Sequence, residues 1–217
     1  MTKKERALLA IELLKQVYPE AICSLDYEKP YELLISTRLA AQCTDARVNI
    51  VTKDLYQKYQ SLEDFAAADL AELEEMVRPC GFYHTKAKDI IGMSQMLLEQ
   101  YNGILPDTVE ELTKLPGIGR KTANLILGDV YGQAGYVCDT HCIRITGLLG
   151  LTDGSKAPLK VEQQLRACIP PEESSNFCHR MVLHGRAVCI ARRPQCQSCT
   201  LRPWCDYFMK NGEEETP

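Results

Sequence analysis

LPGIGRKTA, residues 115–123, is the stretch of this sequence that says most about its fold. A proline and two glycines, Gly117 and Gly119, predict a tight turn between a short helix over 108–114 and a longer helix over 119–131. Glycine lets the backbone come close to a phosphate, and the N-terminus of the following helix presents unpaired N–H groups. A turn of this kind can hold DNA by its phosphates without reading the base sequence.

Lys121 falls in the first turn of the second of these helices. The helix dipole opposes a cation there, and we expect this field, together with partial burial, to favour the neutral amine. A neutral amine is the form that attacks a sugar carbon as a nucleophile. Most lysines are surface residues that face solvent. The glycine-rich turn beside Lys121 favours the interpretation of this lysine as a nucleophile.

Asp139 follows a glycine-containing loop over 132–135 and begins the next expected helix. An aspartate at this place predicts an N-cap, because its carboxylate accepts hydrogen bonds from unpaired N–H groups. The same carboxylate could also take up a proton or stabilise positive charge on a sugar ring. The two roles are compatible. We expect His141, two residues later, to be a packed structural residue.

Eleven cysteines are many for 217 residues, and their odd number argues against a fully paired disulfide framework. Four fall in one segment, as Cys189-x6-Cys196-x2-Cys199-x5-Cys205. Four thiolates so close in sequence can surround one metal centre, and their chemistry alone suits either zinc or an iron–sulfur cluster. The others are expected to pack as small hydrophobic residues: Cys23, Cys43, Cys80, Cys138, Cys142, Cys168 and Cys178.

Apolar residues recur at spacings of three and four along the chain, and alternating stretches are few. This pattern predicts an all-α protein. Glycine, proline and asparagine residues, which tend to begin or end helices, indicate the helix limits. The expected helices cover residues 3–18, 30–42, 44–59, 84–101, 119–131, 139–149, 158–168 and 172–187.

The net charge is −4, but its distribution along the chain is uneven. Acidic residues gather in 61–75 and in the tail 212–217, whereas basic residues gather at 120–121 and over 180–193. A basic face on an acidic body is compatible with modest affinity for nucleic acid. No apolar run reaches membrane-spanning length and the N-terminus lacks the form of a signal peptide, so we expect a cytoplasmic, nucleoid-associated protein without membrane contact.

The hairpin, the aspartate and the cysteine segment, in this order, resemble the endonuclease III family of helix–hairpin–helix DNA glycosylases and AP lyases. The resemblance also includes ELLI at 32–35, AQCTD at 41–45, GFYH at 81–84 and HGR at 184–186. It implies two helical domains with a DNA-binding cleft between them. Residues 23–135 would form a six-helix barrel domain, and 1–22 with 136–217 would form a domain that holds a [4Fe–4S] cluster.

The resemblance assigns roles to individual residues of this chain. It makes Lys121 the nucleophile and Asp139 its acid–base partner, and it gives the cluster to the four cysteines. The expected DNA contacts are Gln42, Phe82, His84, Gly117, Ile118, Gly119, Arg186, Arg192 and Arg193. Gln42 and Phe82 would fill the gap left by an extruded nucleotide. Core packing is the alternative interpretation of Phe82. The family more often has an aliphatic residue at the position of Phe82, and it more often has asparagine at the position of His84.

The implied function is base-excision repair of double-stranded DNA with damaged bases or abasic sites, by a monomer. Lys121 would displace an oxidised pyrimidine and then cleave the strand through a Schiff base and β-elimination. A pyrimidine-dimer or mismatch-specific glycosylase of the same superfamily is an alternative, although mismatch enzymes typically lack this lysine. A non-catalytic iron–sulfur protein that binds DNA is an alternative of another class.

Overall fold

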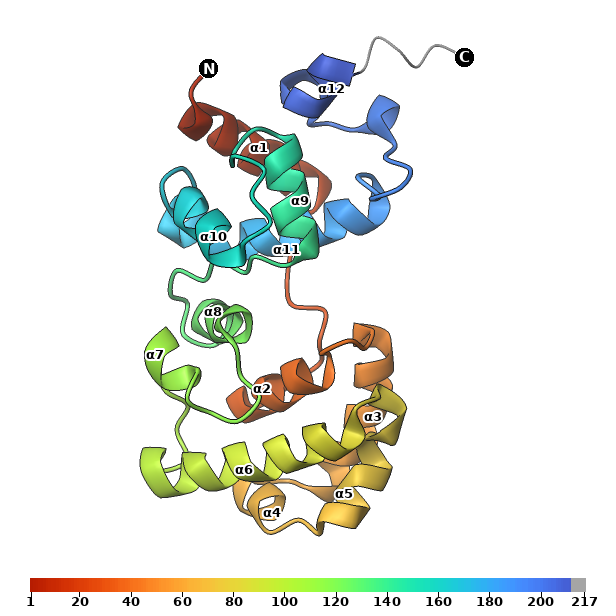
Figure 1. Ribbon diagram of the computed structural model, residues 1–217, viewed down its shortest axis with the longest axis vertical. Helices are drawn as coiled ribbons and strands as arrows, with labels where there is room; N and C mark the ends of the chain where they lie inside the picture. Colours follow the sequence, from red (N-terminus) through yellow and green to blue (C-terminus); the bar gives the residue numbers. More distant parts are fainter. Residues whose placement is uncertain (212–217) are drawn as a thin grey trace. The chain divides into compact units, whose positions relative to one another are not determined.

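The computed structural model describes residues 1–211, and these residues form helices and no strand (Figure 1). The all-α prediction is therefore confirmed. The acidic tail 212–217 lies outside the described residues. Two compact units are present: the central unit, Cys23–Tyr131, and the terminal unit, which is Met1–Ile22 with the described part of Gly132–Pro217.

The central unit is built around α6, a helix of 19 residues that packs against α2, α4 and α5. Its core is apolar, with Leu33, Phe65, Ile90 and Leu97 fully buried. The elements in chain order are α2 (Pro30–Leu39), α3 (Asp45–Lys58), α4 (Leu62–Ala66), α5 (Leu70–Val77), the 3-10 helix η1 (Arg78–Cys80), α6 (Tyr83–Tyr101), α7 (Val109–Leu112) and α8 (Arg120–Asp129).

Helices α4 and α5 occupy the acidic segment 61–75, for which no helix was predicted. Local signals for them were present: the Ser61 hydroxyl accepts the Asp64 N–H, and Asp64 accepts the Ser61 N–H in return. Phe65 and Leu73 are fully buried on the inner faces of these two helices. The acidic residues hid the amphipathic pattern because a helix can carry charge on one face and apolar residues on the other.

The terminal unit brings the first helix of the chain together with the C-terminal half. Helix α11 packs against α9 and α1, and Gly185 allows a close approach, because a Cβ there would lie 2.9 Å from Cγ of the His141 ring. The elements are α1 (Lys3–Val17), α9 (Thr140–Leu148), α10 (Pro158–Arg166), η2 (Pro171–Glu173), α11 (Ser174–Ala187), η3 (Cys196–Ser198), η4 (Arg202–Trp204) and α12 (Asp206–Asn211).

Both ends of the described chain meet in the terminal unit. Arg6 of α1 forms an ion pair with Asp206 of α12, and its guanidinium also donates to the Leu149 carbonyl at the end of α9. Because this guanidinium is largely shielded from water, the pair is a stronger tether than an exposed one. It fixes the segment that follows the last cysteine.

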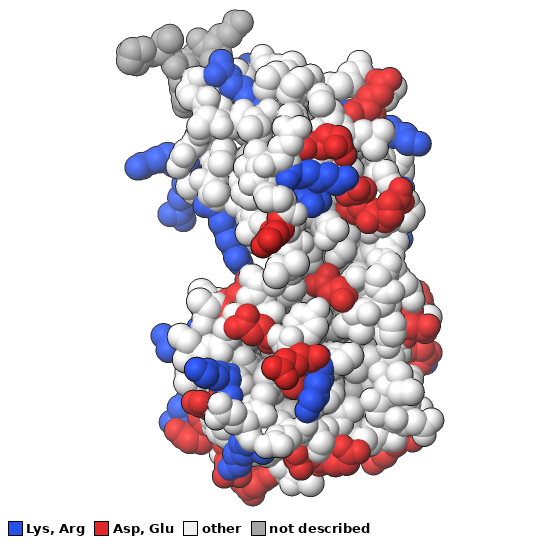
Figure 2. All heavy atoms as spheres, turned by 180° about the vertical axis from the view of Figure 1, so that it is seen from behind, with Lys and Arg blue, Asp and Glu red and all other residues white. Residues whose placement is uncertain are grey.

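Charged side chains are unevenly placed on the face shown in Figure 2. Lys and Arg gather along one margin of the terminal unit, whereas Asp and Glu are frequent along the edge of the central unit. Across residues 1–211, no helix combines the length and apolar character needed to cross a membrane.

Candidate active site and cysteine cluster

The predicted turn between two helices is present, and it joins α7 to α8. Gly117 has a φ of 73°, in the left-handed region that favours glycine. The Ile118 N–H donates to the Leu115 carbonyl at 3.1 Å, which closes the turn. The Ile118 side chain is buried in the core, so any contact of this residue with DNA would use its backbone. Gly119 is the N-cap of α8 in extended conformation.

Lys121 lies in the first turn of α8, as predicted, and its side chain is exposed. The partial burial that we expected for it is therefore absent. The opposite face of α8 is buried through Ala123, Ile126 and Leu127, which hold the helix to the core. The amine thus extends from a fixed helix start into solvent, at the place where a helix dipole disfavours a cation.

Asp139 is the N-cap of α9, and its Oδ1 accepts the backbone N–H of Cys142 at 2.7 Å. The predicted N-cap role of Asp139 is therefore confirmed. The carboxylate is half-buried, next to Cys138 and Cys142, whose side chains are buried. Close by, burial lowers the pKa of the His141 imidazole. The Asp139 carboxylate opposes this shift, whereas the charges of Arg144 and Arg186 add to it.

Gln42 and Phe82 share an unusual backbone conformation. Their φ angles are 57° and 49°, and both side chains are exposed. Phe82 is 65% exposed, which excludes the core-packing interpretation. A bulky residue in the left-handed region is a conformational outlier, and such outliers concentrate at functional sites.

His84 lies one residue beyond the start of α6, close to the exposed Phe82. Its Nδ1 is 2.7 Å from Oε2 of Glu74 in α5, and its ring lies against that of Tyr83 with centroids 4.1 Å apart. The imidazole is exposed at the surface of the central unit. Sequence reasoning did not identify Glu74, because nothing local links it to a residue ten positions later.

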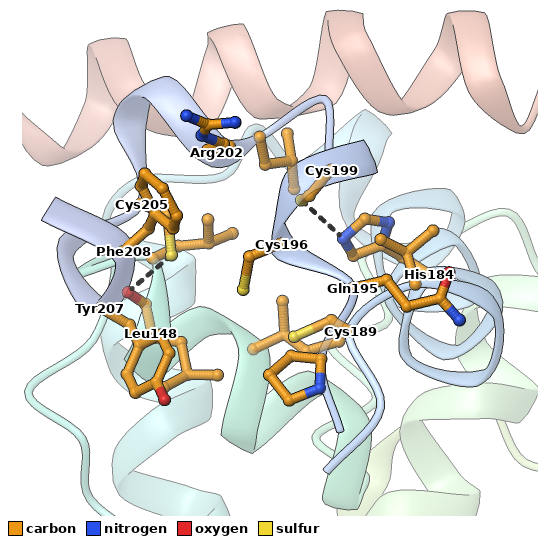
Figure 3. A pocket seen from close by; sticks show the side chains of 15 residues that line it. Leu148, His184, Cys189, Gln195, Cys196, Cys199, Arg202, Cys205, Tyr207 and Phe208 are labelled. Carbon is orange, nitrogen blue, oxygen red and sulfur yellow. Dashed lines mark hydrogen bonds between the residues drawn. The ribbon is translucent and has the colours of Figure 1, made fainter. Parts of the chain in front are cut away.

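The four predicted cysteines line one cavity of the terminal unit. Figure 3 shows the sulfurs of Cys189, Cys196 and Cys205 around a common central space, while Cys199 lies beside His184. Among residues 1–211, no three Cys, His, Asp or Glu side chains converge closely enough for a single metal ion. Four thiols that line one cavity are a ligand set that suits a metal centre.

Side chains beyond the four thiols also approach this cavity. Arg144 donates from Nη1 to Cys189 Sγ at 3.4 Å, and His184 Nε2 is 3.5 Å from Cys199 Sγ. The Cys205 thiol lies 3.4 Å from the Leu148 carbonyl. Burial raises the pKa of the Cys189 and Cys199 thiols, which a bound cation would oppose. Sequence reasoning missed Arg144, which no spacing rule connects to the cysteines.

Three arginines were predicted to contact phosphates, and the structure places all of them on the surface of the terminal unit. Arg186 is exposed near the end of α11. Arg192 and Arg193 are exposed in the loop between Cys189 and Cys196, so their backbone is anchored by residues of the cavity. Exposed guanidinium groups on an anchored loop can bind phosphates.

Comparisons with known proteins agree with this arrangement of motifs. Residues 35–171 match the family model described as HhH-GPD superfamily base excision DNA repair protein. Endonuclease III of Synechocystis sp. is 44% identical over 94% of this chain and 93% of its own length. Endonuclease III of Bacillus subtilis is 40% identical over 94% of this chain and 93% of its own length.

Solved structures of DNA complexes are similar over almost the whole chain. A non-covalent endonuclease III–DNA complex matches with a TM-score of 0.91 and 41% identity, over 99% of this chain and 100% of that chain. A trapped endonuclease III–DNA covalent intermediate matches with a TM-score of 0.90 and 41% identity, over 98% and 100%. The chain therefore belongs to the endonuclease III family, within the HhH-GPD superfamily of base excision DNA repair proteins.

Proposed function

We propose that this protein is a bifunctional DNA N-glycosylase and AP lyase that removes oxidised pyrimidines, with Lys121 as its nucleophile. The observation that carries the proposal is the exposed Lys121 amine at the start of α8, directly after the glycine-rich turn. A relative with 41% identity has been trapped as a covalent intermediate with DNA. A covalent intermediate of this chain would need such a nucleophile.

The reaction begins when the neutral Lys121 amine attacks C1′ of the damaged nucleotide. The base leaves with the electron pair of its N-glycosidic bond and takes up a proton. The sugar ring then opens: the C1′–O4′ bond breaks, O4′ takes up a proton, and Lys121 and C1′ form a Schiff base. This Schiff base acidifies the C2′ protons, and loss of one of them expels the 3′ phosphate by β-elimination. Asp139 supports both steps, because a carboxylate can accept the amine proton and stabilise positive charge on the sugar.

DNA would be held mainly by its backbone. The turn at Gly117 and Gly119 offers N–H groups to phosphates, and Arg186, Arg192 and Arg193 offer guanidinium groups. Gln42 and Phe82 would enter the space vacated by the extruded nucleotide, and His84 would influence which lesion is accepted. We assign these contacts to a barrel domain over 23–135 and a cluster domain over 1–22 and 136–217.

We assign a [4Fe–4S] cluster to Cys189, Cys196, Cys199 and Cys205, because these thiols share one cavity and the endonuclease III family generally carries such a cluster. Its contribution is to anchor the loop that bears Arg192 and Arg193, so no step of the reaction is assigned to it. The partner is double-stranded DNA that contains damaged bases or abasic sites. We propose that the protein acts as a monomer in the cytoplasm, associated with the nucleoid.

The proposal is tested by borohydride trapping on duplex DNA that carries thymine glycol or an abasic site. Wild type should give a covalent complex on both, and Lys121→Ala should give none. Lys160→Ala is the matched control, because Lys160 is an exposed lysine of α10 whose ammonium pairs with Asp153. If wild type gives no adduct on either DNA, the nucleophile assignment is wrong.

The same assay separates the proposed substrate class from its relatives. Cyclobutane dimers and G/T mismatches are offered beside thymine glycol at equal DNA concentration. Faster base release from thymine glycol supports the assignment to oxidised pyrimidines. Faster release from either of the other lesions would replace it with a dimer-specific or mismatch-specific glycosylase.

A further inference from the structure

Lys86 is a fully buried lysine in the central unit, which is rare for this residue type. Its ammonium donates hydrogen bonds to the carbonyls of Leu39 at 2.8 Å and Cys80 at 2.9 Å. Burial lowers the pKa of this ammonium. An apolar side chain at this position would avoid the free-energy cost of burying a charge. The presence of a lysine therefore needs an explanation other than core packing.

The two carbonyls belong to the ends of two different helices. Leu39 is the last residue of α2, and Cys80 is the last residue of η1. Carbonyls at a helix C-terminus have no partner within the helix and carry partial negative charge. A buried cation satisfies both ends at once, and so joins two segments that are far apart in the sequence.

Each of these ends leads within three residues to a proposed DNA contact. The chain runs from Leu39 to Gln42 and from Cys80 to Phe82. Both of these residues have positive φ, and among the non-glycine residues of 1–211 only Asn102 shares this feature. Asn102 ends α6, where asparagine adopts this conformation readily. The two unusual backbones are thus the two that follow the Lys86 contacts.

A left-handed conformation is unfavourable for a non-glycine residue and persists only where surrounding contacts impose it. Lys86 supplies such contacts to both segments. Because one ammonium reaches both carbonyls, the end of α2 and the end of η1 lie close together. One turn further along α6, Asp89 pairs with Arg38 at 2.7 Å, which holds the end of α2 at a second point.

We propose that Lys86 is a positioning residue that keeps the Gln42 and Phe82 segments in one fixed arrangement, so that both side chains enter the DNA stack together. The inference rests on the proposed function, because it concerns the step in which the damaged nucleotide leaves the stack. Lys86 itself is buried and touches no DNA. Its effect reaches the reaction only through the two segments that it joins.

The first test compares Lys86→Met with Ser94→Ala. Methionine keeps the length of the lysine stem and removes its charge and its donors. Ser94 is an equally buried polar residue of α6, and its hydroxyl donates only to the Ile90 carbonyl of the same helix. Both variants are measured for stability, for single-turnover release of thymine glycol and for borohydride trapping on an abasic site.

We expect Lys86→Met to slow base release by about 10²-fold, the loss typical of a small displacement of positioning groups. Trapping on a preformed abasic site should change by less than about threefold, because no base has to be extruded there. Ser94→Ala should keep both rates. Base release by Lys86→Met at the rate of Ser94→Ala would overturn the inference.

The second test asks whether Lys86 acts through the two segments. In a protein that already carries Gln42→Ala and Phe82→Ala, Lys86→Met should slow base release by less than about twofold, because its targets are gone. A fluorescent 2-aminopurine opposite the lesion reports the same event directly: wild type should unstack it and Lys86→Met should not. If Lys86→Met slows base release as much in the double variant as in wild type, Lys86 does not act through Gln42 and Phe82, and the inference is wrong.

Lys86→Gln is the second variant, because its amide can still donate to one carbonyl. If Lys86→Met does not fold, Lys86→Gln should show faster amide exchange at 40–43 and 81–83 together with slower base release. If neither variant folds, Lys86 is a folding residue and the inference is wrong. Failure of wild type to form an adduct on abasic DNA would instead contradict the proposed function.

Discussion

Arg38 of α2 and Asp89 of α6 form an ion pair, with Nε and Oδ2 2.7 Å apart, and Gly117 of the α7–α8 turn lies directly against it. Both side chains are largely shielded from water. The pair therefore connects the turn with α2, which precedes Gln42, and with α6, which follows Phe82. Glycine is required at position 117 both by its positive φ and by this close contact.

Gly117→Ala should destabilise the protein by about 1–3 kcal/mol, because a Cβ there would lie 2.6 Å from Asp89 Oδ2 and the backbone would be strained. Affinity for DNA should fall with it. Gly119→Ala is the control, because its Cβ would meet nothing within 4 Å and its φ is −103°. Urea unfolding measures both variants, and equal stability of the two would contradict the role given to the ion pair.

Asp139→Asn and Asp139→Ala should separate the capping role from the chemical one. Asparagine caps a helix about as well as aspartate, so Asp139→Asn should keep the stability of wild type. It should lose about 10²–10⁴-fold in the rate of Schiff-base formation, because the negative charge is gone. Asp139→Ala should lose the same activity and about 1 kcal/mol of stability as well. Normal trapping by Asp139→Asn would show that the charge plays no part.

Cys205→Ser should lower the iron and sulfide bound per chain, because it removes one of four ligands around the cavity. The unfolding temperature should fall as well, since a metal centre bound only by the folded state stabilises it. Cys168→Ala is the control: Cys168 is buried in the same unit but lies outside the cavity. If zinc is found in place of iron and sulfide, the assignment of the cluster is wrong.

Phe82→Gly and Phe82→Ala both remove the exposed ring, and only glycine relieves the positive φ. We expect equal loss of thymine-glycol release in the two variants. Phe82→Gly should be the more stable of the two, because the strain of about 1–2 kcal/mol exceeds the entropic cost of glycine, roughly 0.5–1 kcal/mol. Thermal unfolding and single-turnover excision give the two readouts. Greater stability of Phe82→Ala would show that this backbone is not strained.

Several elements could be predicted from short-range patterns. The glycines at 117 and 119 marked the turn, Asp139 marked the start of α9, and the cysteine spacing marked the cavity. These predictions succeeded because caps and turns depend on residues within a few positions of one another. The helices α4 and α5 of the acidic segment 61–75 were not predicted. Their amphipathic pattern is recognisable only when the buried apolar residues are considered apart from the exposed acidic ones.

The sequence by itself determined that the chain is helical, where most helices begin, and which motifs it carries, because these follow from local hydrogen bonding and apolar periodicity. Only the tertiary structure decided that Lys86 is buried between two helix ends, that Phe82 faces solvent, and that Gly117 lies on an ion pair. The contact of Lys86 with Leu39 and that of Gly117 with the ion pair join residues tens of positions apart. Their energy comes from packing and desolvation, which no local pattern encodes.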